Sequence, residues 1–235
     1  QLLCVYGVFS RRRESVEFVE LSLEDCERES GKLAAMVASE MEPDLVAYLA
    51  KGSYLIGVDI ASYFDVPLIE LSVCRSGESK KRGMHTLLRL LPAKMRKLMR
   101  GMELKIRKRC EGAHAVAPRQ VSLTGRYPFP SNAEKILLVD DSVDSGASVM
   151  GARRELLKKY PDASVKTAVF NVMSASCDGC QVDYALHHDC LLSTPASKDN
   201  RQYDLFLSLY ESDRYYCGKS RSKINKTEGR EEGVK

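Results

Sequence analysis

The sequence predicts an α/β fold: an open, mainly parallel twisted sheet that carries a basic helical insertion. Two stretches, 45–73 and 136–172, predict the sheet, since each holds a strand-length apolar run, a polar loop, a helical pattern and a second apolar run. This order is typical of the βαβ unit, in which a helix connects two parallel strands. The lysine- and arginine-rich stretch between the two units predicts the insertion.

The N-terminal half contains the first unit and three elements that precede it. Apolar residues at helical spacing end at Val66-Pro67, and the runs on either side have the length of strands. The predicted unit is a strand over Leu45–Leu49, a loop at Ala50–Ser53, a helix from Leu55 to Val66 and a strand over Leu68–Val73. Before it we expect an edge strand over Val5–Phe9 and helices over Val16–Cys26 and Leu33–Met41.

The second unit is predicted in the same way from residues 136–172. It consists of a strand over Ile136–Val139, a polar loop from Asp140 to Ser148, a helix over Val149–Tyr160 and a strand over Val165–Val172. Ligands of open α/β sheets bind outside the carboxyl ends of the strands. The two strand-to-helix loops, one in each unit, are therefore the predicted ligand site.

Composition and charge indicate one globular domain with a basic segment. The chain has 235 residues, of which 44% are apolar and 29% charged. Residues 75–111 hold 13 Lys or Arg against 3 Glu, a balance of +10, so the overall charge of +4 leaves −6 for the remainder. We predict a domain over 1–217 with the insertion at about 75–130 and a flexible tail over 218–235. The insertion should seek phosphate groups.

The loop of the second unit has the chemistry of a sugar-phosphate site. In ILLVDDSVDSGAS, residues 136–148, a buried strand delivers Asp140 and Asp141 and is followed by small polar residues that open a helix. Backbone amides at a helix start suit a phosphate, and adjacent carboxylates suit sugar hydroxyls, directly or through Mg²⁺. A dinucleotide site is excluded because no G-x-G-x-x-G opens either helix, and Lys51-Gly52-Ser53 has the wrong order for a Walker loop.

This stretch resembles the phosphoribosyl pyrophosphate motif of the type I phosphoribosyltransferases, with Ser145 in place of the commoner Thr. The resemblance implies that Asp140 and Asp141 hold the ribose hydroxyls and Mg²⁺, and that Asp144 is a proton acceptor. It also implies that the 5′-phosphate is wrapped by Asp144, Ser145, Gly146, Ala147 and Ser148.

The loop of the first unit is similar to the family's pyrophosphate loop. Its residues are Ala50, Lys51, Gly52 and Ser53. The resemblance implies displacement of pyrophosphate from the anomeric carbon of phosphoribosyl pyrophosphate, with Lys51 and Arg75 stabilising the departing charge. Arg75 belongs to a group of cations where related enzymes carry a lid; the group is Arg75, Lys80, Lys81 and Arg82.

The acceptor stays open at this point. Leu91, Met95, Leu98, Met102 and Ile106 give a helix over Pro92–Arg109 one apolar face beside a basic one, which either packs on the domain or meets an anionic membrane. This insertion loosely resembles members associated with bacterial surface-polysaccharide ribofuranosylation and favours a lipid-linked glycan acceptor. A purine or other nucleobase is the alternative, with Tyr184 as the candidate stacking residue. A non-catalytic nucleotide-binding regulator is the second alternative.

Cysteine usage and hydropathy bear on metals, partners and location. Eight cysteines spread along the chain indicate a reducing cytoplasm, and the lack of a long apolar run argues against a membrane span, so contact with the inner membrane face would be peripheral. Cys177, Cys180, His187, His188 and Cys190 are spaced poorly for zinc, so free thiols are predicted, with zinc left open. The scarcity of aromatic residues in the insertion argues against nucleic acid. A homodimer is left open.

Overall fold

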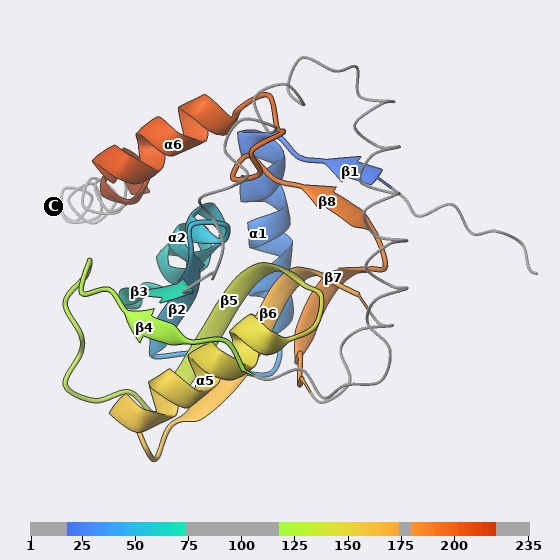
Figure 1. The fold of residues 1–235 in the computed structure, drawn as a ribbon. Coiled ribbons are helices and arrows are strands. Elements are labelled where there is room, and N and C mark those ends of the chain that lie inside the picture. Colours follow the sequence, from blue (N-terminus) through green and yellow to red (C-terminus); the bar gives the residue numbers. More distant parts are fainter. Residues whose placement is uncertain (1–17, 74–117, 174–179, 220–235) are drawn as a thin grey trace, which may run out of the picture.

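The computed structural model describes residues 18–73, 118–173 and 180–219 (Figure 1). Its main feature is a six-stranded sheet in the order β4-β3-β2-β5-β6-β7. All neighbouring strands are parallel except β4, which runs antiparallel to β3. The strands are β2 Leu45–Ala50, β3 Leu68–Val73, β4 Val121–Leu123, β5 Lys135–Val143, β6 Ser164–Val172 and β7 Tyr184–His188. This architecture confirms the predicted fold class.

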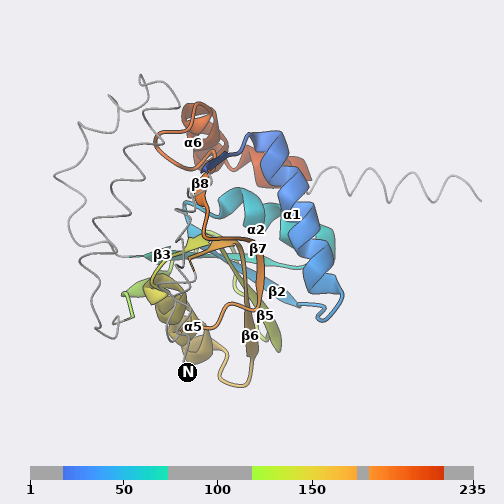
Figure 2. The same cartoon turned by 90° about the vertical axis from the view of Figure 1, so that its right-hand side faces the viewer.

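Helices cover both faces of the sheet, which explains why the central strands are apolar runs (Figure 2). Helices α1 (Leu23–Ala38) and α2 (Tyr54–Phe64) pack on one face, and α5 (Ala147–Lys159) packs on the other. Alternation along β5 directs Leu137 and Val139 to the α1–α2 side and Leu138 to the α5 side. All three side chains are fully buried.

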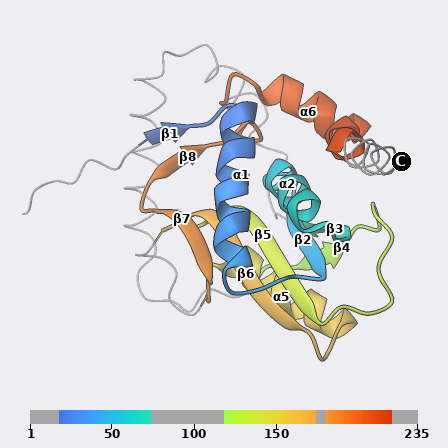
Figure 3. The ribbon, with the colours of Figure 1, turned by 180° about the vertical axis from the view of Figure 1, so that it is seen from behind.

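A second, two-stranded sheet pairs the first described strand with a strand from the C-terminal part of the chain (Figure 3). It pairs β1 (Phe18–Glu20) in parallel with β8 (Leu191–Ser193), and helix α6 (Tyr203–Ser212) follows. Asn200 fastens the connection, because its Nδ2 donates to the carbonyl oxygens of Leu21 and Ser193 at 3.0 and 3.1 Å. The sequence did not predict this small sheet or α6.

The prediction of a helix over Val16–Cys26 is wrong. Residues 18–20 form β1, and α1 begins only after Ser22. The Ser22 hydroxyl accepts the Asp25 N–H at 3.1 Å, and the Asp25 carboxylate accepts the Ser22 N–H at 3.0 Å. This capping box starts one helix that continues to Ala38 in place of two. The expected strand at Val5–Phe9 lies outside the described residues.

Strand β5 is longer than predicted, and the loop after it is shorter. Backbone pairing with β6 continues through Val143, whose side chain is buried against the α5 side of the sheet. Asp140 and Asp141 are therefore strand residues, and only Asp144–Gly146 separates β5 from α5.

The last described residues, at the start of the predicted tail 218–235, contact the domain. Lys219 lies against the domain, with Nζ 3.4 Å from Oδ1 of Asp59 on α2 and a second contact to Glu27 on α1. Tyr215 donates to the same Asp59 oxygen at 2.8 Å. Two helices thus anchor the chain up to residue 219, and residues 220–235 lie outside the described part.

Candidate functional site

The two predicted loops meet at the carboxyl ends of β2 and β5. These strands are neighbours in the sheet, with Tyr48 opposite Val139. A Cβ atom on Gly52 would lie 3.0 Å from Oδ2 of Asp141, so the first loop packs tightly against the carboxylate. Loops that are almost 90 residues apart in the sequence therefore form one site, as the order of the two units predicts.

The first loop exposes its lysine and buries its serine. Lys51 is exposed, and the Ala50–Lys51 peptide is cis. Ser53 is fully buried, and its hydroxyl donates to the carbonyl oxygens of Leu49 and Val139 at 2.6 and 3.1 Å. The Ser53 side chain thus joins the loop to β2 and β5, while Lys51 is exposed and Gly52 is half-buried.

The carboxylates of Asp140 and Asp141 are half-buried at the end of β5. Oδ1 of Asp140 accepts the N–H of Asp141 at 2.9 Å, and Oδ1 of Asp141 accepts the N–H of Ser142 at 2.8 Å. These bonds fix both carboxyl groups, and Oδ2 of Asp141 lies toward the first loop. Carboxylate oxygens are the donors that Mg²⁺ prefers, so the pair fits the predicted metal.

The second loop turns sharply at Gly146, which has φ +73°. The turn leads directly into α5, whose first residue, Ala147, is buried, while the side chains of Asp144, Ser145 and Ser148 are half-buried. Free N–H groups at such a helix start attract anions. Cys180 covers the turn, since a Cβ on Gly146 would lie 2.2 Å from the Cβ of Cys180.

Helix α6 packs beside the first loop through a cluster formed by Lys51, Glu70, Arg126 and Tyr210. Nζ of Lys51 lies 5.1 Å from the centre of the Tyr210 ring, and the Tyr210 hydroxyl donates to Oε2 of Glu70 at 2.8 Å. The guanidinium of Arg126 lies 4.2 Å from the same ring and 3.6 Å from Glu70. Burial, and then the hydrogen bond to Glu70, raises the pKa of Tyr210 to about 12. The cluster thus anchors α6 beside Lys51.

Two further connections lie at the same end of the sheet. Nδ2 of Asn171, near the end of β6, donates to Oγ of Ser142 and to the carbonyl oxygen of Cys190, both at 3.1 Å, and so ties β5 to the start of the small sheet.

The candidate stacking residue Tyr184 does not reach this end. It is buried at the start of β7 and bonded to Lys166 and Glu40. Tyr184 is therefore wrong as a base-stacking residue.

The cysteines of the predicted zinc alternative have separate surroundings. Cys180 packs on Gly146, whereas Cys190 is buried beside Asn171. Among the described residues no group of three or more metal-binding side chains gathers, and Cys177 lies outside them.

The lid cation Arg75 and the basic helix Pro92–Arg109 also lie outside the described part. Within that part, no helix is long and apolar enough to cross a membrane.

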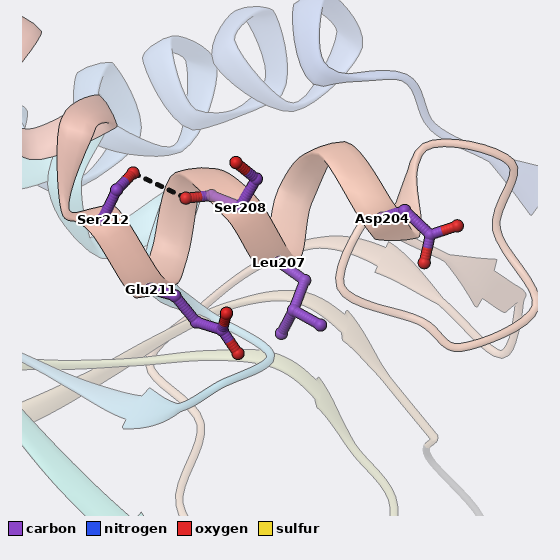
Figure 4. A pocket seen from close by; sticks show the side chains of 5 residues that line it. All are labelled: Asp204, Leu207, Ser208, Glu211 and Ser212. Atoms are coloured by element: carbon purple, nitrogen blue, oxygen red, sulfur yellow. Dashed lines mark hydrogen bonds between the residues drawn. The ribbon is translucent and has the colours of Figure 1, made fainter.

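A shallow hollow elsewhere on the surface is not the candidate site. Figure 4 shows its lining side chains, all from α6: Asp204, Leu207, Ser208, Glu211 and Ser212. One helix alone forms it, and neither of the two strand-to-helix loops contributes a residue to its lining. The loops at the ends of β2 and β5 therefore remain the site that the structure supports.

The sequence motifs do not include Arg119, Asn171 or Tyr210. Each touches the site or its support from an element far away in the chain, and none belongs to a recurring motif. The sequence contains no signal that would have identified them, because their positions depend on how the elements pack.

Comparison with known proteins identifies the fold. No protein-family model and no curated protein matches the sequence significantly. Among solved structures, the chain resembles the Helicobacter pylori xanthine-guanine-hypoxanthine phosphoribosyltransferase at TM-score 0.53 and 13% identity, covering 82% of this chain and 99% of that one. It also resembles a purine phosphoribosyltransferase of Pyrococcus horikoshii at TM-score 0.50 and 16% identity, covering 76% and 93%. The protein therefore has the fold of the phosphoribosyltransferases.

Proposed function

We propose that the protein is a phosphoribosyltransferase that takes the 5-phosphoribosyl group from phosphoribosyl pyrophosphate and releases pyrophosphate. The observation that carries the proposal is the meeting of the two loops, in which a Cβ added to Gly52 would lie 3.0 Å from Oδ2 of Asp141. A ligand with a sugar and two phosphate-bearing ends needs this juxtaposition. One loop would bind the diphosphate, the carboxylates the ribose hydroxyls, and the start of α5 the 5′-phosphate.

The chain's own residues would act mainly by positioning and charge. Asp140 and Asp141 would hold the ribose hydroxyls and bind Mg²⁺, and that ion would supply positive charge near the pyrophosphate. Lys51, exposed beside Gly52, would add a second positive charge at that leaving group. Asp144, at the turn before α5, would accept the proton of the acceptor as the new bond to the anomeric carbon forms.

A purine nucleobase is the acceptor that we propose. The support is the likeness in fold to two enzymes named for purine substrates, together with the small sheet, which Asn171 ties to the carboxyl end of β6. Nothing in the comparisons supports the lipid-linked glycan that the basic insertion favours, and that segment lies outside the described residues. The glycan acceptor is therefore an outcome for the assay to exclude.

Ligand-dependent stabilisation tests the donor site. Phosphoribosyl pyrophosphate with Mg²⁺ should raise the melting temperature of the wild type, because a ligand that binds the native state stabilises it. Asp140→Asn combined with Asp141→Asn should remove this shift while leaving the unliganded melting temperature nearly unchanged. Asp162→Asn, an exposed carboxylate outside the loops, serves as the control. An unchanged shift in the double variant would contradict the assignment.

Pyrophosphate release tests turnover and acceptor together. The purified protein with phosphoribosyl pyrophosphate and Mg²⁺ should release pyrophosphate when hypoxanthine, guanine, xanthine or adenine is added. Release only with a lipid-linked glycan would refute the purine acceptor. Binding without release on any acceptor would refute the enzyme and leave a nucleotide-binding regulator.

A further inference from the structure

Arg119 lies directly on the turn that begins α5. Its Nη1 donates to Oγ of Ser148 at 3.2 Å, and its backbone N–H donates to the carbonyl oxygen of Ala147 at 2.9 Å. The side chain is exposed, so the guanidinium keeps donors available to a ligand. Arg119 comes just before β4, about 30 residues from the loop in sequence, and the sequence alone does not bring the two together.

The backbone contact is close and specific. A Cβ on Gly151, one turn into α5, would lie only 2.2 Å from the carbonyl oxygen of Arg119. Any other residue at position 151 would therefore push the segment before β4 away from the helix. Together with the hydrogen bond to Ala147, this contact holds the backbone at Arg119 and limits where its guanidinium can reach.

The second loop carries negative charge, which would oppose the binding of a phosphate unless a nearby cation offsets it. Residues 140–148 contain Asp140, Asp141 and Asp144 and no Lys or Arg. Carboxylates this close to a phosphate dianion oppose its binding, and the helix-terminal amides offset that repulsion only in part. An arginine fork is the side chain that pairs best with a phosphate, through two parallel N–H bonds.

We propose that Arg119 is a ligand-binding residue that contacts the 5′-phosphate of the phosphoribosyl group, with Ser148 orienting its guanidinium. The inference rests on the proposed function and adds a cation to the phosphate subsite that the motif itself does not supply. It assigns Arg119 to the 5′-phosphate end of the ligand only. The pyrophosphate end belongs to the loop that contains Lys51.

Two partial ligands separate the two ends of the site. Titration calorimetry with Mg²⁺ should show that Arg119→Ala weakens the binding of ribose 5-phosphate and of phosphoribosyl pyrophosphate about tenfold or more, the usual loss when a charge-assisted bond is removed. Affinity for pyrophosphate alone should stay within about twofold, because that ligand does not reach the second loop. Arg119→Lys should restore part of the loss, since it keeps the charge without the fork.

The matched control is Arg154→Ala, which removes a half-exposed arginine of α5 that pairs with Glu155. It should leave all three affinities unchanged. If the wild type binds phosphoribosyl pyrophosphate and Arg119→Ala binds it equally well, the assignment of Arg119 is wrong. An equal loss for pyrophosphate and ribose 5-phosphate would also overturn it, because the effect would then not be confined to one end. A wild type that binds none of the ligands refutes the proposed function instead.

Discussion

Replacing Gly146 by alanine tests whether the turn before α5 is built as the structure shows. Two separate penalties are expected. Gly146 has φ +73°, a conformation that costs an L-residue about 1–2 kcal/mol. The new Cβ would also lie 2.2 Å from the Cβ and 2.8 Å from the Sγ of Cys180, where ordinary contact requires at least 3.4 Å.

The second penalty cannot be relieved by rotating a side chain, since the nearest atom of Cys180 is its Cβ. One backbone segment must move, and overpacking of this kind costs about 1–3 kcal/mol. Gly146→Ala should therefore lower the free energy of unfolding by about 2–5 kcal/mol in total. It should also abolish stabilisation by phosphoribosyl pyrophosphate, because the displaced turn carries the amides that would bind the phosphate.

Two further variants separate the penalties in urea unfolding. Gly125→Ala is the matched control, with φ +70° and nothing within 4 Å of the added Cβ, so it measures the backbone penalty alone. Adding Cys180→Gly to Gly146→Ala should recover about 1–3 kcal/mol, after subtraction of the effect of Cys180→Gly by itself. Equal costs for Gly146→Ala and Gly125→Ala, or no recovery in the double variant, would show that the contact between Gly146 and Cys180 does not contribute the second penalty.

Two other measurements address the support of the first loop. Ser53→Ala should cost about 1–3 kcal/mol of unfolding free energy, because it removes the buried hydrogen bonds from the hydroxyl to the carbonyl groups of Leu49 and Val139. The exposed Ser39→Ala should change it by less than about 0.5 kcal/mol, and equal effects of the two variants would contradict the buried role of Ser53. Folding raises the pKa of Tyr210 from about 10 to about 12. The contribution of Tyr210 to the free energy of unfolding is therefore fully present below about pH 10 and is lost as the pH rises toward 12. Over this interval the free energy of unfolding in urea should fall as the tyrosinate absorbance rises, and both changes should be smaller in Tyr210→Phe than in the wild type. Complete ionisation of Tyr210 in the folded protein near pH 10 would argue against its burial in the cluster.

The sequence by itself determined the two βαβ units and the placement of their loops. Buried parallel strands are apolar on both faces, so Leu45–Leu49 and Ile136–Val139 are recognisable as short apolar runs without any knowledge of the fold. Parallel connection then requires the loops after them to lie at one edge of the sheet. This is why Lys51, Gly52, Asp140 and Asp141 could be grouped before their distances were known.

Only the tertiary structure decided what surrounds these loops. Strands β1 and β8 have three residues each, too few for a periodic pattern, and they exist because the two segments pair with each other. The length of β5 was equally hidden, since Ser142 and Val143 belong to the strand through their pairing with β6. The hydrophobic pattern of a segment indicates which of its own residues are buried. Strand pairing also depends on a second segment, which that pattern does not describe.

The side chains that support the site follow the same rule. Ser53 looks like a ligand-facing serine in the sequence, but the neighbouring strand β5 supplies an acceptor that turns its hydroxyl inward. Arg119 and Tyr210 reach the loops from the segment before β4 and from α6, and their contacts arise when those elements pack against α5 and β3. A motif records residues that are close in the chain, and contacts between distant elements exist only once the sheet, its helices and α6 have assembled.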